Sequence, residues 1–239
     1  MLKQITLLLI CLCVTAYAEP LRVALFDVEP YAKQVPGTAA QGVYVEIANL
    51  LAREAGMTPS LALMPFPRVA ATVAANKADL TFSFETEQLK RDAHRIGPLV
   101  LADSILVSKR GLTLTEPKQV AGRIVGRLRG GCADLIEVLP GPPSFYDLPG
   151  FDSGLRMLLA NRVDVLCTTR EAFKHYLKQT RLARDDFGDI LLLHRRQVWI
   201  YTANGLDVAV RVRLERAAER IRKNGTLDAI WSRYVQVGD

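Results

Sequence analysis

The sequence predicts an α/β protein built as two lobes of alternating strands and helices. Two series of short apolar runs, each followed by amphipathic stretches, occupy residues 21–84 and residues 123–167. Such alternation is typical of mostly parallel sheets whose faces are covered by helices. Two further strand-like segments, residues 102–111 and 194–204, belong to neither series. They predict two strands that cross between the lobes as a hinge.

The first series contains five predicted elements in short succession. Apolar runs of strand length alternate with segments whose apolar residues recur at helical spacing. Strands are predicted at residues 21–26, 59–64 and 79–84, and helices at residues 43–56 and 67–78. The first helix ends at Gly56, because glycine is the residue most often found just after a helix.

The second series repeats this order, and two helices follow it. Strands are predicted at residues 123–128, 144–148 and 163–167, and helices at residues 130–140, 152–162, 206–223 and 226–235. The last two helices are expected to return to the first lobe. The predicted first lobe therefore comprises residues 19–104 and 202–239, and the second lobe comprises residues 105–201.

The first 18 residues have the features of a secretory signal peptide. Lys3 precedes an apolar run, and small residues end the segment at Ala18. The run is too short to span a bilayer comfortably. We therefore expect an exported, periplasmic protein. The alternative is a lipid anchor at Cys11 or Cys13, and the bulky residues that precede both cysteines argue against it.

Composition and charge narrow the kinds of partner. The chain has 31 Lys and Arg residues against 25 Asp and Glu residues, a formal charge of +6. Both signs alternate along residues 210–223, and no basic stripe interleaved with aromatic residues is present, so nucleic acid is not an expected partner. A small anionic ligand fits this mild excess of positive charge better.

The cysteines and histidines leave a disulfide open and predict no metal or cofactor. Cys132 and Cys167 follow the ends of two strands that should be neighbours, so they could be bonded in an oxidising compartment. The alternative is a pair of small buried thiols. The three histidines show no metal-ligand spacing with them.

Six segments in order carry a resemblance to a known family. They are GVYVEIANLLAREAG, NKADLTFSF, Arg91 followed by Gly97 and Pro98, AGRIVGRLRGG, ANRVDVL and IRKNGTLDAIWSRYV. Over residues 21–235 the chain resembles family 3 of the bacterial extracellular solute-binding proteins, the periplasmic amino acid binding type. The resemblance implies a monomer whose two lobes close on a small molecule, without catalysis. It also implies a membrane partner, either an ABC importer or a sensor kinase.

Arg91 is the predicted ligand-binding cation of the first lobe. It follows an apolar strand that ends in small polar residues, and its guanidinium could hold a carboxylate with two parallel hydrogen bonds. The alternative is a solvated surface arginine. The resemblance assigns Arg91 to the carboxylate site, with Ser83 and Thr86 completing its hydrogen bonds. It assigns Phe66 and Tyr31 to an aromatic sandwich, and both rings could instead belong to the core.

Further candidates lie at the edges of the predicted cleft. Gly130, Gly131 and Cys132 open a predicted helix, where backbone N–H groups can point at an anion. They could equally form an ordinary strand-to-helix turn. Arg68, two residues after Phe66, opens a helix near the same edge of the cleft as Phe66, or it is a solvated helix residue. Arg129 is a further cation near the cleft.

Thr169 departs from the pattern of the family. Members that bind α-amino acids carry an aspartate here for the ligand's ammonium, and a threonine cannot neutralise that charge. Either Glu85 or Glu46 substitutes, or the ligand is an organic acid instead of a standard amino acid. A dehydratase-like enzyme on the same fold is a second hypothesis, with Glu85 or Glu171 as proton donor. A sensing module for a kinase is the third.

Overall fold

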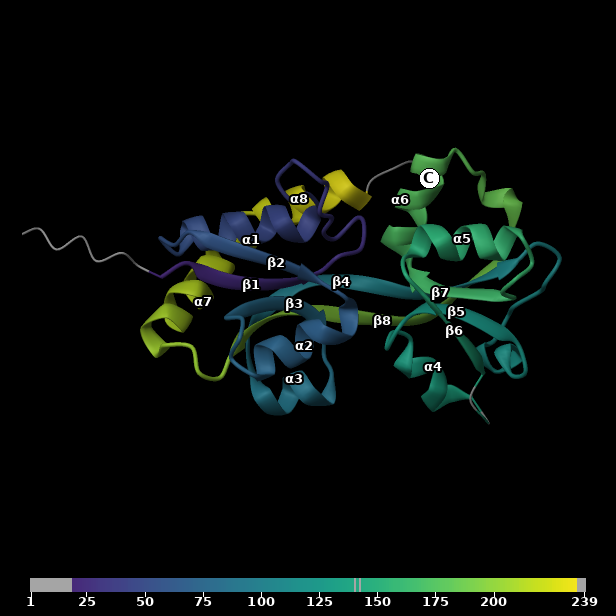
Figure 1. Ribbon diagram of the computed structural model, residues 1–239, viewed down its shortest axis with the longest axis horizontal. Coiled ribbons are helices and arrows are strands. Elements are labelled where there is room, and N and C mark those ends of the chain that lie inside the picture. The colour runs from purple at the N-terminus through teal and green to yellow at the C-terminus, as the bar shows by residue number, and fades with distance from the viewer. Residues whose placement is uncertain (1–18, 140, 142, 236–239) are drawn as a thin grey trace, which may run out of the picture.

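The computed structural model describes residues 19–139, 141 and 143–235. The predicted signal peptide, with Cys11 and Cys13, lies outside the described residues. The chain forms two α/β lobes that lie side by side and share one mixed sheet (Figure 1). The α/β architecture expected from the alternation of apolar runs is confirmed.

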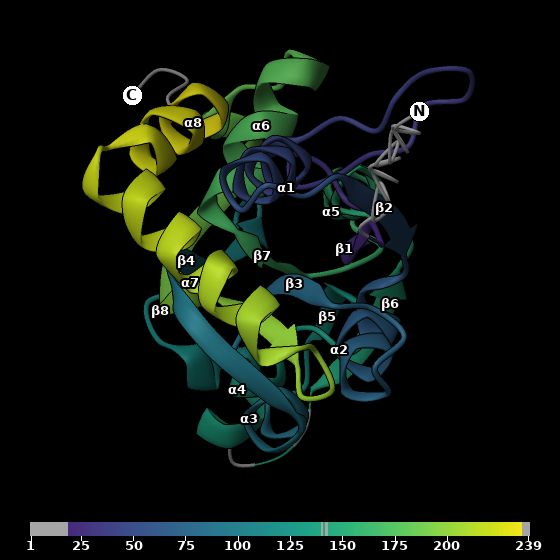
Figure 2. The ribbon, with the colours of Figure 1, turned by 90° about the vertical axis from the view of Figure 1, so that its left-hand side faces the viewer.

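The first lobe is built from both ends of the chain. Its elements are β1 (Leu21–Phe26), α1 (Val43–Glu54), β2 (Pro59–Met64), α2 (Phe66–Ala74), β3 (Leu80–Phe84), α3 (Glu87–Asp92), α7 (Val208–Lys223) and α8 (Thr226–Val235). Strand β1 pairs in parallel with both β2 and β3. Figure 2 shows α1 and α8 on one side of these strands and α2 and α3 on the other.

The second lobe repeats the plan with shorter helices. Its elements are β5 (Ile124–Leu128), α4 (Ala133–Val138), β6 (Ser144–Leu148), α5 (Phe151–Leu159), β7 (Val165–Thr169) and α6 (Arg170–Thr180). Strand β5 pairs in parallel with both β6 and β7. The carboxyl ends of the strands of each lobe thus lie together, as in other parallel sheets.

Two long antiparallel strands join the lobes. Strands β4 (Ala93–Lys109) and β8 (Phe187–Ala203) pair with each other from Ala93 to Lys109, and the sheet order is β2-β1-β3-β8-β4-β7-β5-β6. Strand β8 also pairs with β3 of the first lobe, and β4 pairs with β7 of the second. The two predicted hinge strands are confirmed, although both are longer than expected. The lobe boundaries near residues 104 and 202 stay a prediction.

Local sequence explains most element ends, and it also explains two differences from the prediction. Helix α4 begins at residue 133, not 130, because Cys132 adopts a left-handed backbone with φ of 61°. The prediction omitted α6, whose sequence is largely polar. This helix is held by the Thr169 hydroxyl, which accepts a hydrogen bond from the Ala172 N–H at 3.2 Å, and by the buried side chains of Phe173 and Tyr176.

Candidate ligand-binding site

A cavity of about 120 Å³ lies between the lobes, beside the carboxyl ends of their strands. Ligands of open α/β sheets commonly bind at such strand ends. The first lobe and the crossing strands contribute Phe26, Tyr31, Tyr44, Phe66, Ser83, Phe84, Ala102, Ser104, Leu193 and Val198. The second lobe contributes Arg127, Leu128, Gly131, Cys132, Phe151, Cys167, Thr168 and Thr169.

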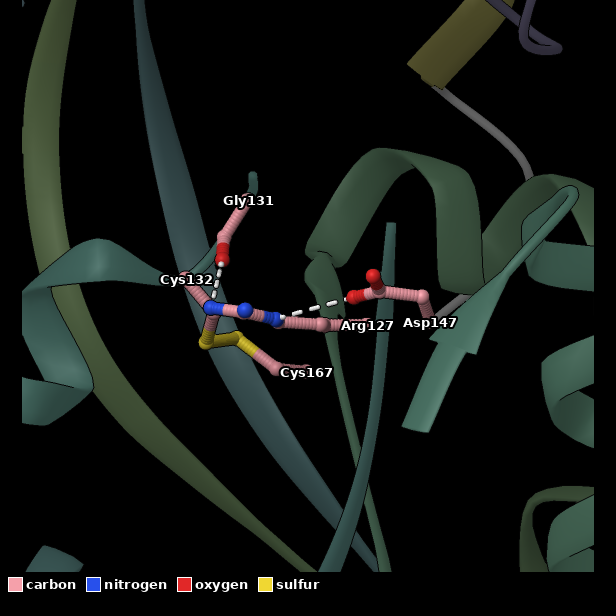
Figure 3. The surroundings of a disulfide bond; sticks show 5 residues. All are labelled: Arg127, Gly131, Cys132, Asp147 and Cys167. Atoms are coloured by element: carbon pink, nitrogen blue, oxygen red, sulfur yellow. Dashed lines mark hydrogen bonds and ion pairs between the residues drawn. A yellow bond between two sulfur atoms is a disulfide. The ribbon is translucent and has the colours of Figure 1, made fainter. Parts of the chain in front are cut away.

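Arg127 is the cation of this cavity. It lies near the end of β5, and its guanidinium carbon is 3.6 Å from the centre of the Phe145 ring. Its Nε donates to Asp147 Oδ1 at 3.3 Å, and its Nη1 donates to the Gly131 carbonyl at 3.1 Å (Figure 3). A guanidinium has five N–H donors. The Nη2 group makes no hydrogen bond to another described residue, so it remains for a ligand.

Asp147 does not neutralise the cavity completely. Its second oxygen, Oδ2, accepts a hydrogen bond from Arg129 Nε at 3.2 Å. One carboxylate therefore serves two guanidinium groups, and this cluster has a net charge of +1. Arg129 is 77% exposed, whereas Arg127 is 18% exposed, so the less hydrated cation is the one that lines the cavity. The cluster favours an anionic ligand.

A disulfide fixes the turn that receives Arg127. Cys132 and Cys167 are bonded, with their Cα atoms 6.3 Å apart, and both line the cavity. The bond joins the left-handed turn before α4 to strand β7 (Figure 3). Gly131, whose carbonyl accepts from Arg127, immediately precedes the bonded Cys132. The disulfide therefore holds the backbone that orients the guanidinium.

Aromatic rings form the first-lobe wall of the cavity. The Phe26 ring lies 5.1 Å from Tyr31, 5.5 Å from Tyr44 and 5.5 Å from Phe66, as measured between ring centres. Tyr31 and Tyr44 also contact the Trp231 ring of α8. Rings in such tilted and edge-to-face contact support one another. The wall is therefore a continuous aromatic surface.

One hydrogen bond in the cavity joins the two lobes directly. The Tyr31 hydroxyl lies 2.5 Å from Thr169 Oγ1, and Thr169 also caps α6. Burial raises the pKa of Tyr31, and the nearby Glu171 raises it further, so the phenol stays protonated. The bond therefore holds the two lobes together in this structure.

Tyr31→Phe is expected to lower the free energy of unfolding by about 1 kcal/mol, because it removes this interlobe hydrogen bond and little else. Urea unfolding measures the change. Tyr146→Phe is the matched control, since Tyr146 is 47% exposed. Equal stabilities of the two variants would contradict the role given to the Tyr31 hydroxyl.

A buried acidic group lies behind the tyrosine wall. Glu171 is 6% exposed, and its Oε2 has no hydrogen-bond partner among the described residues. Burial raises the pKa of this carboxyl. The neighbouring Asp103 differs, because hydrogen bonds from Arg195 at 2.7 Å and Arg170 at 2.9 Å hold its pKa below the usual range. Two nearby carboxyl groups therefore have pKa values shifted in opposite directions.

Glu171→Gln is expected to stabilise the protein increasingly as pH rises. In the unfolded chain the pKa of a glutamate is about 4.3. The pKa of Glu171 in the native state is higher, so the protonated carboxyl stabilises the native state fully at a pH below the unfolded pKa. This contribution is lost as pH rises through the native pKa, whereas glutamine stays neutral. Urea unfolding at pH 5 and pH 8 should show a larger gain at pH 8. Glu87→Gln, at an exposed position, is the control, and matching pH dependence in both variants would argue against a raised pKa.

The structure brings six predicted site residues to the cavity. They are Tyr31, Phe66, Ser83, Gly131, Cys132 and Thr169. They come from both lobes and from five separate segments of the chain. Gly130 lies beside this group with φ of 75°, and it faces Pro67 instead of the cavity.

Three other predicted residues lie elsewhere. The Arg91 side chain is 71% exposed and donates two hydrogen bonds to the neighbouring Asp92, at 2.9 and 2.8 Å. Thr86 caps α3, because its hydroxyl accepts from the Leu89 N–H at 3.1 Å. Arg68 lines an adjacent open cleft of about 710 Å³, together with Arg129. The geometry therefore favours Arg127 over Arg91 as the ligand-binding cation.

The suggested replacements for the amine-binding acid also lie outside the cavity. Glu85 pairs with Arg95 at 2.9 Å, and Glu46 pairs with Arg233. Neither lines the cavity. Neither residue can therefore take the place of the aspartate that would bind the ammonium group of an α-amino acid.

The sequence prediction missed Arg127, Tyr44, Phe26 and Thr168. One available signal was position, since Arg127 lies at the carboxyl end of a parallel strand and Thr168 lies near the end of its neighbour. Phe26 has the same position at the carboxyl end of β1, but an apolar ring there looks like core, and Tyr44 lies in a buried helix and has no such signal. Thr168 is 4% exposed, and its hydroxyl has no hydrogen-bond partner among the described residues.

In residues 19–139, 141 and 143–235, no helix has the length and apolar character needed to cross a membrane. The same part of the chain contains no cluster of three metal-ligating side chains.

A protein-family model matches most of the chain. The model described as bacterial extracellular solute-binding proteins, family 3, matches residues 21–237. Comparison with curated proteins gives no match.

Solved structures of similar fold include amino acid binding proteins and a sensor domain. An ancestral arginine-binding protein bound to glutamine is 19% identical, with a TM-score of 0.73, 90% of this chain covered and 97% of the other. The AbpA substrate-binding protein of an amino acid ABC transporter from Streptococcus pneumoniae, bound to L-arginine, is 20% identical, with a TM-score of 0.75 and coverages of 91% and 94%. A histidine kinase sensor domain similar to periplasmic binding proteins is 17% identical, with a TM-score of 0.74 and coverages of 92% and 97%. At these identities the likeness is one of fold.

Proposed function

Because this chain belongs to family 3 of the bacterial extracellular solute-binding proteins, we propose that it captures a small carboxylate-bearing molecule, an amino acid or a related organic acid, between its lobes. It acts in the periplasm as a monomer and passes the ligand to an ABC importer. Residues 1–18 are its signal peptide, and the lobes close and open around the crossing strands.

The observation that carries this proposal is Arg127 in a cavity walled by both lobes. A partly buried guanidinium with an unused Nη2 group is suited to a carboxylate. Ligand bound there would touch aromatic rings of the first lobe and the Gly131–Cys132 turn of the second. It would thus favour the closed state, as required of a ligand that drives closure.

A thermal-shift screen tests the proposal. Amino acids, dicarboxylates and aromatic acids are added to the wild-type protein, and a ligand that binds only the native state should raise its melting temperature. A bound carboxylate whose shift disappears on esterification would support the role of the carboxylate. A screen in which only uncharged solutes give a shift would argue against it.

A sensing role is the second candidate, and the fold shared with a histidine kinase sensor domain favours it. In that case the closed form would report ligand to a kinase instead of feeding an importer. Genes for ABC permease and ATPase subunits beside the gene of this protein would favour import. A neighbouring sensor kinase gene would favour sensing.

A dehydratase-like enzyme is the third candidate. Glu171 supplies a carboxyl group with a raised pKa, as a proton donor requires, although it lies behind the tyrosine wall and does not line the cavity. Incubation with a cyclohexadienyl carboxylate, followed by mass spectrometry, tests this role. Product formed by the wild type and lost in Glu171→Gln would replace the binding proposal with an enzymatic one.

A further inference from the structure

We propose that the ligand is a monocarboxylate with a compact ring or branched hydrocarbon body and no ammonium group. This inference rests on the proposed function and narrows it, since that function includes amino acids. It concerns the charges and surfaces that a ligand would meet in the cavity between the lobes.

The cavity offers one anchoring charge, and that charge is positive. Arg127 retains its Nη2 donors, and the cluster of Arg127, Asp147 and Arg129 has a net charge of +1. One carboxylate bound to Arg127 would bring this cluster to neutrality. A second negative charge on the ligand would find no matching cation among the described residues that line the cavity.

Hydroxyl groups can complete the hydrogen bonds of the carboxylate. Thr168 Oγ1 is buried and has no partner among the described residues, although it lines the cavity. The register of β5 and β7 pairs Gly126 with Leu166, so the side chains of Thr168 and Arg127 lie on opposite faces of the sheet. Ser83 and Ser104 also line the cavity. The two serine hydroxyls have no charge and can donate hydrogen bonds to a carboxylate.

The remaining walls suit a hydrocarbon. Phe26, Tyr31, Tyr44, Phe66, Phe84 and Phe151 line the cavity together with Leu128, Leu193 and Val198. The volume of about 120 Å³ is close to the roughly 150 Å³ of an engineered apolar cavity that binds benzene. One ring or one branched chain of similar size is therefore the body that the cavity can surround.

Three nearby carboxylates are paired with arginines of the protein, and a fourth carboxyl group, that of Glu171, does not line the cavity. Asp103 binds Arg170 and Arg195, Asp147 binds Arg127 and Arg129, and Glu85 binds Arg95. An ammonium in the cavity would meet hydroxyl groups and ring faces, and it would lie near Arg127. Removing it from water under those conditions is unfavourable. Loss of the ammonium should therefore strengthen binding.

Matched pairs of ligands test this inference by isothermal titration calorimetry on the wild-type protein. The pairs are 3-phenylpropanoate with phenylalanine and 4-methylpentanoate with leucine, which differ only by the α-ammonium group. The acid without ammonium is expected to bind at least 10-fold more tightly in at least one pair. Arg127→Lys should weaken that binding at least 10-fold, whereas Arg156→Ala, which removes an exposed cation of the same lobe, should not.

Other outcomes would overturn the ligand class. Equal or tighter binding of either amino acid would do so and would leave the proposed solute-binding function intact. Tighter binding of trimethylglycine than of both acids would show that the rings hold a cation. If neither member of either pair binds, this class is excluded, and the wider thermal-shift screen alone decides the proposed function.

Discussion

Arg127→Ala is expected to raise the dissociation constant of the carboxylate ligand by roughly 100-fold. Truncating one partner of a buried charge pair costs about 3 kcal/mol, which corresponds to that change in affinity. Calorimetry with the best carboxylate from the thermal-shift screen measures it. Arg127→Lys should recover only part of the affinity, because an ammonium keeps the charge but lacks the planar fork.

Arg91→Ala is the variant that separates two hypotheses about the carboxylate site. The order of motifs assigns the binding of the carboxylate to Arg91, whereas the geometry favours Arg127. Arg91 is 71% exposed and paired with Asp92, so its loss should leave affinity within about 2-fold of the wild type. If Arg91→Ala lost binding and a folded Arg127→Ala kept it, Arg91 would be the carboxylate-binding residue, as the order of motifs implies.

Removing the disulfide is expected to lower the free energy of unfolding by about 3 kcal/mol. Cys132 and Cys167 are 35 residues apart, and a cross-link of that length restricts the unfolded chain by roughly 3–4 kcal/mol. For a chain of this size, such a loss lowers the melting temperature by about 10 °C. The double variant Cys132→Ala/Cys167→Ala is compared with the wild type by urea and thermal unfolding.

The same variant should also bind the ligand less well. Without the disulfide, the Gly131–Cys132 turn no longer has a covalent link to β7, so the carbonyl that orients Arg127 becomes less fixed. Dithiothreitol should reproduce both losses in the wild type and change nothing further in the double variant. A wild-type protein whose melting temperature is insensitive to the reductant would refute the stabilising role.

The alternation of apolar runs and amphipathic stretches was sufficient to predict most of the fold. The runs LRVALF and PSLALM have strand length and lie on either side of the helix α1, and both are strands at the predicted residues. Helix α6 was missed because its sequence is mainly polar, and its position depends on a cap and on a few side chains buried by tertiary contacts. Helix α3 has six residues, too few to show a helical period.

The candidate site was harder to predict than the fold. Arg91 follows an apolar strand and Arg127 lies near the end of one, and the sequence alone does not show which side chain points into the cavity. Helix α3 carries Arg91 to an exposed surface beside Asp92, whereas β5 directs Arg127 to the cavity. Local sequence does not encode that difference, because it depends on which residues the folded lobes bring opposite each strand end.

The paired crossing strands have a mechanical consequence. A two-stranded ribbon that is hydrogen-bonded along its length bends more easily than its strands slide past each other, since sliding would break many bonds at once. The ladder of β4 and β8 is irregular at four places, between Arg95 and Gly97, Pro98 and Val100, Ser104 and Ile105, and Val107 and Lys109, so bending should concentrate at these places. In the proposed closure, the lobes would rotate about this ribbon. Each cycle of opening and closing would return Tyr31 to the same Thr169, without any search for register.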